Sequence, residues 1–245
     1  MKRIHHDQMA RIGRAMSSRV RLRALNLLAQ RPWRVSELAE ELGESVAATS
    51  AHLKVLRAAG MVVEEKRGRE HWCRVEAVEI FDLLVAMRRV AEAVLPELRE
   101  AVRGDADDPH LLRVASLKEL AEDVAGDRMA LVDLRPTAEF DAGHIPGARS
   151  YPAAKLAEAD LAPLRRWERL VAYCRGPWCL MAREGVQALN ARGLPARRLR
   201  AGVVDWLAEG LPLIRGEQGA ATEDKQGKED ARPRDRGPSL KETKK

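Results

Sequence analysis

The chain has 245 residues, of which 45% are hydrophobic and 33% charged, and its formal net charge is +6. This length and apolar content suffice for two compact domains, and no apolar run approaches the roughly 20 residues of a membrane-spanning helix, which excludes such a helix. The basic excess mildly favours an acidic partner such as nucleic acid.

The first 16 residues are basic and lack the apolar core of a signal peptide, so we expect a cytoplasmic protein with no membrane partner. Thiols stay reduced in that compartment. The three cysteines, Cys73, Cys174 and Cys179, are therefore expected to be reactive or inert rather than to form a structural disulfide framework.

Residues 1–103 are predicted to form a mainly helical domain. The stretch VSELAEELG is predicted to be a short helix, with Ser36 as its N-cap and Gly43 at its C-terminal end. A second helix follows directly and ends at Gly60. Two extended runs then flank Arg67-Gly68-Arg69, which predicts a β-hairpin.

A long helix is predicted over residues 78–102, and Pro96 is expected to bend its last turns. Its apolar positions alternate steps of four and three, which is typical of a seam for a partner helix. The seam consists of Ile80, Leu84, Met87, Ala91, Val94 and Leu98.

Two short helices followed by a basic hairpin have the layout of a winged helix-turn-helix. In this layout the second helix enters the major groove of DNA and the hairpin contacts the DNA backbone or the minor groove. Hydroxyl, imidazole and cationic side chains can bind base edges and phosphates. The candidate DNA-binding residues are Ser45, Thr49, Ser50, His52, Lys54, Arg67 and Arg69.

Residues 10–95 resemble the ArsR/SmtB family of bacterial repressors. The resemblance rests on VSELAEELGES and on the phrase S-x-H-L-K-x-L-x-x-A-G-M-V that starts at Ser50. It implies a homodimer, formed through the first and last helices, that binds a palindromic operator in double-stranded DNA. The metal ligands of the family's sensors are missing, since the first short helix has no cysteine pair and the last helix no histidine.

The remaining metal-ligand candidates are few. His5 and His6 are adjacent, and His71 lies near Cys73 in the hairpin. One thiol does not make a soft-metal site, so we expect His5 and His6 to be solvated and Cys73 to be a small strand residue. We expect no metal and no cofactor.

A linker is predicted at residues 104–110, where the sequence is GDADDPH. Residues 111–215 alternate strand and helix patterns, and MALVDLR and RLVAYC are apolar runs typical of parallel strands buried on both faces. We predict an α/β domain with a parallel sheet. Residues 216–245 are polar and charged and are predicted to be a disordered tail.

Residues 110–214 resemble the rhodanese homology domain. The resemblance rests on D-L-R at residues 133–135, on E-F-D-A-G-H-I-P-G-A from Glu139, and on A-G-V-V-D-W-L-A-E-G-L-P from Ala201. It implies that Cys174 is the nucleophile that carries a persulfide.

The residues around Cys174 support the same chemistry. Cys174 ends a buried strand and precedes a helix, so loop amides and the helix dipole are expected to favour its thiolate, and Arg175 adds a positive charge. A thiolate is the nucleophile that accepts a sulfane sulfur. We expect Asp133 and Arg135 to support the loop through an ion pair or hydrogen bonds. Gly176 and Trp178 are further loop residues with supporting roles, and Trp178 either shapes donor access or contacts the N-terminal domain.

Three alternatives compete at this loop. A phosphatase needs C-x5-R, and the arginine position is Leu180 here, so we reject this interpretation. A purely structural rhodanese domain usually lacks the cysteine, which this chain has. Cys179 stands where many rhodaneses have Arg or Thr, and it either resolves a persulfide on Cys174 or merely fills the start of the helix.

These observations predict a dimeric transcriptional regulator, and in particular a repressor, that senses or processes sulfane sulfur through Cys174. The donor would be thiosulfate, a polysulfide or a persulfide. A sulfurtransferase with a DNA-binding or dimerisation module is the second hypothesis. A redox or metalloid sensor that uses Cys174 and Cys179 directly is the third.

Overall fold

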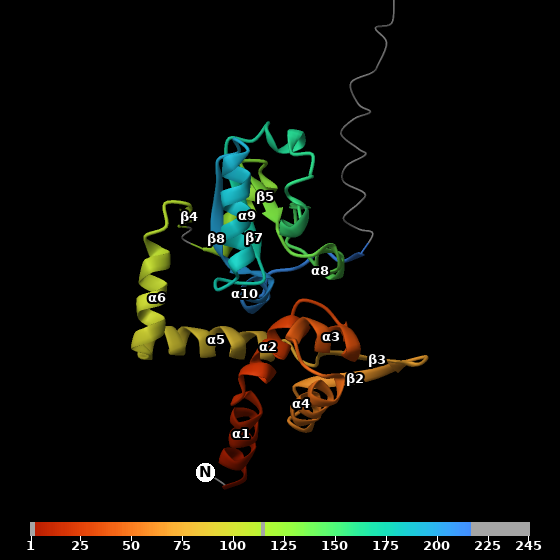
Figure 1. Cartoon of the computed structure of the whole chain (residues 1–245). Helices are drawn as coiled ribbons and strands as arrows, with labels where there is room; N and C mark the ends of the chain where they lie inside the picture. Colours follow the sequence, from red (N-terminus) through yellow and green to blue (C-terminus); the bar gives the residue numbers. More distant parts are fainter. Residues whose placement is uncertain (1–2, 114–115, 217–245) are drawn as a thin grey trace, which may run out of the picture.

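The computed structural model describes residues 3–113 and 116–216, so the predicted tail lies outside the described residues except for Gly216. A helical domain and an α/β domain lie one above the other, and helix α5 runs between them (Figure 1). No helix in the described part of the chain is long and apolar enough to cross a membrane.

The N-terminal domain is a winged helix-turn-helix, as predicted. Four helices surround an apolar core in which Leu25, Leu38, Leu53 and Leu56 are at most 1% exposed. A three-stranded antiparallel sheet of order β1-β3-β2 carries the wing, defined as residues 62–75. The elements are α1 (Arg3–Met16), α2 (Arg19–Leu28), β1 (Trp33–Arg34), α3 (Val35–Leu42), α4 (Val46–Ala58), β2 (Val62–Arg67) and β3 (Glu70–Val75).

The predicted C-terminal cap of α3 is confirmed and the predicted N-terminal cap is not. Gly43 ends the helix in the left-handed conformation, at φ +70°, where glycine is unstrained. The prediction of Ser36 as N-cap is wrong, because α3 begins at Val35 and its N-cap is Arg34. The pairing of Trp33 and Arg34 with strand β3 fixes the extended chain up to Arg34, and the helix starts immediately after it.

Pro96 divides the predicted long helix instead of bending it. Helix α5 (Glu79–Val94) ends at Leu95, which is extended at φ −93° and ψ 116°, and α6 (Pro96–Ala106) begins a new direction. Proline disfavours the helical conformation of the preceding residue and suits the first position of a helix. Helix α6 also takes in residues 104–106, which the composition assigned to the linker.

The C-terminal domain has the predicted α/β fold with a parallel sheet. Its five strands lie in the order β4-β8-β7-β5-β6 and every pairing is parallel. Two short 3-10 turns, η1 (Ala153–Lys155) and η2 (Ala162–Leu164), precede β7. The other elements are β4 (Leu111–Leu112), α7 (Leu117–Ala125), β5 (Ala130–Asp133), α8 (Thr137–Ala142), β6 (Ala148–Ser150), β7 (Leu170–Cys174), α9 (Leu180–Ala191), β8 (Ala196–Gly202) and α10 (Val203–Ala208).

The central strand β7 places Cys174 at the carboxyl edge of the sheet. All five residues of β7 are buried, because it lies between β5 and β8 with helices on both faces. Cys174 pairs with Gly202 at the end of β8. A Cβ atom at Gly202 would lie 2.5 Å from the carbonyl oxygen of Cys174 and 2.6 Å from the carbonyl carbon of Arg175, so only glycine fits there.

We predict that Gly202→Ala lowers the free energy of unfolding by about 1–3 kcal/mol, because the new methyl group must displace backbone atoms of the loop. Urea unfolding followed by circular dichroism measures this change. Gly104→Ala is the control, since a Cβ there meets no atom within 4 Å in helix α6. Equal stability of Gly202→Ala and the parent protein would contradict the close approach of β8 to the loop.

Candidate functional site: a dithiol loop between two domains

The loop after β7 brings two thiols together. Cys174 is the last residue of β7, and Cys179 is the N-cap of α9. The chain turns between them with a hydrogen bond from the amide of Cys179 to the carbonyl of Gly176, 3.1 Å long. The two Sγ atoms are 2.8 Å apart. Cys174 is only 1% exposed, whereas Cys179 is half-buried.

A buried ion pair supports the loop from below. Asp133 and Arg135 have fully buried side chains, and Nη2 of Arg135 lies 2.6 Å from Oδ2 of Asp133. The hydroxyl of Tyr173 donates to the same carboxylate oxygen over 2.6 Å. Arg135 also donates to the carbonyl of Gly143. These bonds fix the carboxyl ends of β5 and β7 relative to each other.

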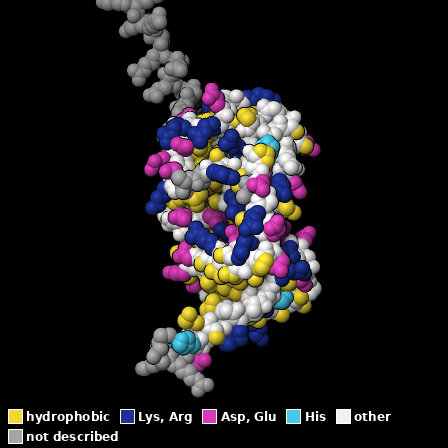
Figure 2. Space-filling view, turned by 90° about the vertical axis from the view of Figure 1, so that its left-hand side faces the viewer, with side chains coloured by type: hydrophobic (Ala, Val, Ile, Leu, Met, Phe, Trp, Pro, Cys, Tyr) yellow, Lys and Arg dark blue, Asp and Glu magenta, His cyan; other side chains and the backbone are white. Residues whose placement is uncertain are grey.

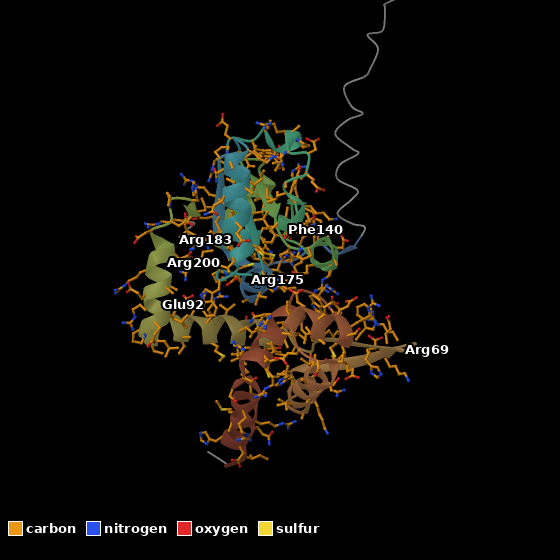
Figure 3. The ribbon with its side chains drawn as sticks, in the orientation of Figure 1. Arg69, Glu92, Phe140, Arg175, Arg183 and Arg200 are labelled. Carbon is orange, nitrogen blue, oxygen red and sulfur yellow. The ribbon has the colours of Figure 1, made fainter. Side chains whose placement is uncertain are left out.

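The sequence suggested that Arg175 directs its charge at the sulfur of Cys174. In the structure its guanidinium binds carboxylates instead. Its guanidinium binds the carboxylate of Glu139, which is 1% exposed, through Nε at 2.9 Å and Nη2 at 2.5 Å. Its Nη1 donates to Glu41 on α3 over 2.8 Å. The label of Arg175 in Figure 3 lies where the two domains meet. The side chain is therefore a connection between domains.

The pKa shifts of the two thiols run in opposite directions and favour the thiolate at Cys179, whereas the sequence led us to expect it at Cys174. The hydrogen bond with Cys174 and amides including those of Met181 and Ala182, which point at the sulfur of Cys179, lower the pKa of Cys179 to about 6. The pKa of Cys174 is raised well above its usual range by the bond to Cys179 and by burial. The physical reason is that the N-terminus of α9 faces Cys179, one loop away from the end of β7.

A cavity of about 370 Å³ lies beside the loop. One wall is helix α6, and the other walls are the loop, the start of α9 and strand β8. Cys179 lines this cavity and Cys174 does not. Trp178 is 53% exposed at its mouth and donates from Nε1 to Glu92 of α5 over 3.0 Å, so it both shapes access and contacts the N-terminal domain. Gly176 lies against the ion pair of Arg88 and Asp205.

Most of the predicted DNA-binding residues lie on the exposed side of α4 and the wing. Ser45, Ser50 and Lys54 are exposed and His52 is half-exposed, although the Ser45 hydroxyl also accepts the amide of Ala48 as the cap of α4. Arg67 is exposed and pairs with Glu65, and Arg69 lies at the tip of the wing (Figure 3).

Thr49 is a correction. Its side chain lies on the buried face of α4, and its hydroxyl has no hydrogen-bond partner among the described residues. Thr49 therefore cannot reach DNA. From the sequence alone Thr49 could not be assigned to the buried face, because the polar and apolar positions of α4 are not sharply separated.

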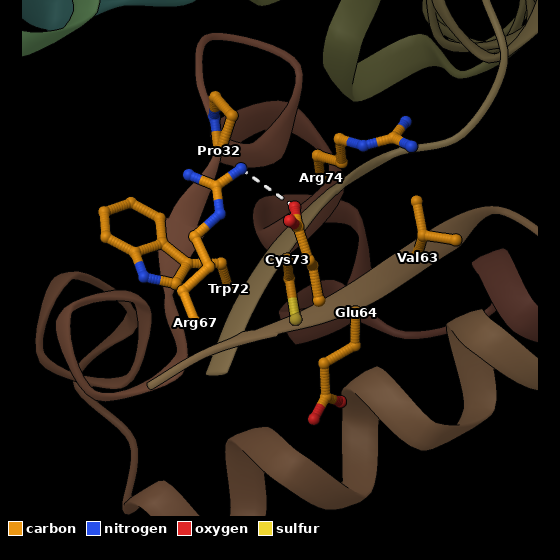
Figure 4. Close-up of a pocket in the computed structure, with 8 residues that line it drawn as sticks. Pro32, Val63, Glu64, Arg67, Trp72, Cys73 and Arg74 are labelled. Atoms are coloured by element: carbon orange, nitrogen blue, oxygen red, sulfur yellow. Dashed lines mark hydrogen bonds and ion pairs between the residues drawn. The ribbon is translucent and has the colours of Figure 1, made fainter. Parts of the chain in front are cut away.

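The third cysteine is buried in the wing. Cys73 lies in the floor of a cavity of about 240 Å³ whose walls include Arg67 and Trp72 (Figure 4). Cys73 is fully buried, and burial raises the pKa of its thiol to about 11, so this thiol is unreactive. The His71 ring bonds Glu64 over 2.6 Å. Within residues 3–113 and 116–216, no group of three or more ligand-type side chains is arranged to hold a metal ion.

Several residues at the domain interface were not identified from the sequence. Gln30 is 5% exposed and bonds both Arg135 and the carbonyl of Arg175. Glu41, Arg88 and Glu92 bond the α/β domain from α3 and α5. No sequence signal distinguishes them from the many other polar residues on these helices.

Comparison with known proteins places both domains. The family model described as "Bacterial regulatory protein, arsR family" matches residues 18–63, and the model described as "Rhodanese-like domain" matches residues 116–209. The chain is 35% identical to the HTH-type transcriptional regulator Rv0324 of Mycobacterium tuberculosis over 213 residues, which cover 86% of this chain and 92% of the relative.

Solved structures match the N-terminal part. A possible transcriptional regulatory protein (fragment 1–100) of Mycobacterium bovis is 30% identical, with a TM-score of 0.37, and the match covers 38% of this chain and 99% of that chain. HlyU of Vibrio cholerae is 26% identical, with a TM-score of 0.34, over 37% of this chain and 97% of that chain. On the match to the M. tuberculosis protein and to the two family models, the chain belongs to the ArsR-family HTH-type transcriptional regulators, with a rhodanese-like domain as its C-terminal part.

Proposed function

We propose that the protein is a homodimeric repressor whose affinity for operator DNA falls when sulfane sulfur reacts at the loop of Cys174 and Cys179. The donor is a persulfide, a polysulfide or thiosulfate. The observation that carries this proposal is the bond between Arg175, inside the cysteine loop, and Glu41 on α3, the first helix of the helix-turn-helix. A single ion pair therefore joins the cysteine loop to the helix-turn-helix.

A second connection runs through Gln30 at the end of α2. Its amide nitrogen lies 3.5 Å from the carbonyl of Arg175, and its amide oxygen accepts from Nη1 of Arg135 over 3.2 Å. The same side chain thus contacts the loop and the buried ion pair beneath it. A displacement of the loop changes both bonds, and α2 contacts α3 and α4.

A third connection reaches α5. Arg88 of α5 pairs with Asp205, and the other oxygen of Asp205 accepts the amide of Gly202 over 2.9 Å. Glu92, one turn further along α5, accepts from Trp178 of the loop and from Arg200 of β8, both over 3.0 Å. Helix α5 therefore responds to the same loop as α3.

Exposed apolar side chains on α1 and α5 support the homodimer. Hydrophobic surface gathers at the height of α1 and α5 in Figure 2. Such a surface, on the faces of α1 and α5 that point away from the rest of the chain, suits a second copy of the chain. A dimer places two recognition helices for two half-sites of an operator. The exposed apolar residues are Ile4, Met9, Leu83, Met87, Val90 and Val94.

Reaction with a donor requires the loop to move. A sulfane sulfur transferred from R–S–SH to a cysteine thiolate leaves R–SH and adds one sulfur atom to the cysteine. The two Sγ atoms are already 2.8 Å apart in a closed loop, so an added sulfur displaces one of them. Displacement strains the bonds from Arg175 to Glu41 and Gln30, which favours a different position of α3. Coupling of about 1–3 kcal/mol is typical of such linked sites.

Turnover as a sulfurtransferase has less support. An anionic donor such as thiosulfate needs a free cation at the thiol, and the guanidinium of Arg175 is held by two carboxylates. Helix α6 and Trp178 also narrow the approach to the loop. A sensor that reacts once per signal suits this geometry better than an enzyme that exchanges donor and acceptor repeatedly.

We predict that treatment of the reduced protein with inorganic polysulfide weakens its binding to the DNA upstream of its own gene at least tenfold at one fixed salt concentration. The double variant Cys174→Ser/Cys179→Ser keeps the affinity of the untreated protein and loses the response. Fluorescence anisotropy with labelled DNA measures both. Tight binding that is indifferent to polysulfide in the parent protein would overturn the proposal.

We predict that Glu41→Gln uncouples the two domains. The variant loses the charge that holds Arg175 to α3, so we expect affinity for DNA within about threefold of the parent protein and a response to polysulfide of less than threefold. Glu40→Gln is the matched control, because Glu40 is exposed on the same helix and the substitution removes the same charge. An unchanged response in Glu41→Gln would exclude the ion pair as the route.

The wing tip offers a test of the DNA-binding face. We predict that Arg69→Ala weakens operator binding several-fold and lowers the slope of affinity against salt concentration by about one unit, because one phosphate contact is lost. Arg197→Ala removes the same charge from an exposed position on β8 and leaves both quantities unchanged. Equal effects of the two variants would show that only net charge matters.

A further inference from the structure

We propose that Cys179 takes the sulfane sulfur first, that Cys174 resolves it to a disulfide, and that the donor is a small persulfide with a carboxylate, held in the cavity between α6 and the loop. The inference rests on the proposed function only in that the loop reacts with sulfane sulfur. It reverses the order of the two cysteines that the rhodanese resemblance implies.

Access separates the two thiols. A donor that enters the 370 Å³ cavity meets Cys179, which lines it together with Pro177, Trp178 and Leu180. Cys174 is 1% exposed at the centre of the sheet edge and does not line the cavity. Sulfur transfer requires in-line contact between the attacking sulfur and the donor. Among the described residues of the loop, Cys179 is the thiol that can make this contact.

Electrostatics favour the same thiol. Cys179 caps helix α9, and the amides of Met181 and Ala182 stabilise its thiolate. Its pKa of about 6 leaves it mainly ionised at neutral pH. The bond to Cys179 and burial raise the pKa of Cys174, so Cys174 keeps its proton. The nucleophile and the proton source are thus already assigned before a donor arrives.

The cavity walls define the donor. Helix α6 contributes an apolar side made of Leu98, Ala101 and Val102, which suits an aliphatic stem. The opposite side carries Arg198 and Arg200 from β8 (Figure 3 labels Arg200). The carboxylates of Asp105 and Glu92 bind the outer nitrogens of these guanidinium groups.

Two donors on this side are buried without an acceptor among the described residues. The Nε atoms of Arg198 and Arg200 are buried and have no hydrogen-bond partner in residues 3–113 and 116–216. The side chain of Arg198 is only 3% exposed, and Oδ2 of Asp105 is 3.7 Å from Nε of Arg200, beyond hydrogen-bond distance. A buried donor without an acceptor is unfavourable. A ligand carboxylate supplies the missing acceptor oxygens.

The reaction balances with the groups present. The Cys179 thiolate attacks the outer sulfur of R–S–SH, the S–S bond of the donor breaks, and R–S⁻ takes the proton of Cys174 and leaves as R–SH. The Cys174 thiolate then attacks Sγ of Cys179, and HS⁻ leaves as the Cys174–Cys179 disulfide forms. Two thiols are oxidised and one sulfane sulfur is reduced to sulfide. An S–S bond of about 2.0 Å needs less than 1 Å of movement from the present 2.8 Å.

Mass spectrometry of single-cysteine variants tests the order. The full-length protein is mixed with N-acetylcysteine persulfide at pH 7 and alkylated at intervals. We expect Cys174→Ser, which keeps a hydroxyl as hydrogen-bond donor, to accumulate a persulfide on Cys179. We expect Cys179→Ser to react at least tenfold more slowly, and the parent protein to form the disulfide and release sulfide. Iodoacetamide modification of Cys179 should have its midpoint near pH 6.

The outcomes separate the two proposals. A fast persulfide on Cys174 in the Cys179→Ser variant, with an inert Cys179 in the other, would overturn the order and leave the proposed function intact. No reaction at either cysteine would overturn both. The expected order together with unchanged DNA affinity would support the present inference and overturn the proposed function only.

A second pair of measurements tests donor recognition. We expect the parent protein to react at least fivefold faster with N-acetylcysteine persulfide than with its methyl amide, which lacks the carboxylate. Arg200→Met removes this preference, whereas Arg197→Met, on the outer face of the same strand, retains it. Equal rates for acid and amide in the parent protein would overturn the assignment of the cavity to a carboxylate.

Discussion

The guanidinium of Arg175 lies between two carboxylates that belong to different domains. Glu139 binds it from the α/β domain and Glu41 from the helix-turn-helix. Because both cysteines lie within a few residues of Arg175, this side chain links the dithiol directly to α3. Glu139 is buried, so its ion pair with Arg175 is costly to break on one side only. The side chain of Glu41 is 39% exposed, so the pair that reaches α3 is the weaker of the two.

The loop places its two thiols in different surroundings. Strand β7 buries Cys174 at the centre of the sheet, and the turn at Gly176 returns the chain so that Cys179 caps α9 beside it. The helix dipole and the amides of α9 then act on the second thiol. A motif comparison assigns the chemistry to the first cysteine, because it sees the order of residues and not the direction of the helix.

Much of the fold was predictable from local patterns. Gly43 and Gly60 end helices, the apolar runs of β5 and β7 indicate a parallel sheet, and the two family phrases identify both domains. Pro96 was recognised as a disruption, but whether a proline bends a helix or starts a new one depends on what the following segment packs against. Thr49 was misassigned because the faces of α4 become distinct only when α2 and α3 cover one of them.

The interface was not predictable. Gln30, Glu41 and Glu92 are ordinary polar residues on helices that carry many of them, and their partners lie more than 80 residues away in the chain. No local pattern records such a pairing. The unsatisfied Nε atoms of Arg198 and Arg200 likewise appear only when β8 packs beside α6. These long-range contacts connect the cysteine loop to the DNA-binding domain.

The reduction potential of the Cys174–Cys179 pair, measured with and without saturating operator DNA, tests the central claim most directly. If DNA binds the dithiol form more tightly than the disulfide form, linkage requires DNA to stabilise the dithiol by the same factor. A tenfold difference in affinity raises the potential by about 30 mV. The account predicts at least this shift, and an unchanged potential would show that the loop and the DNA-binding helices act independently.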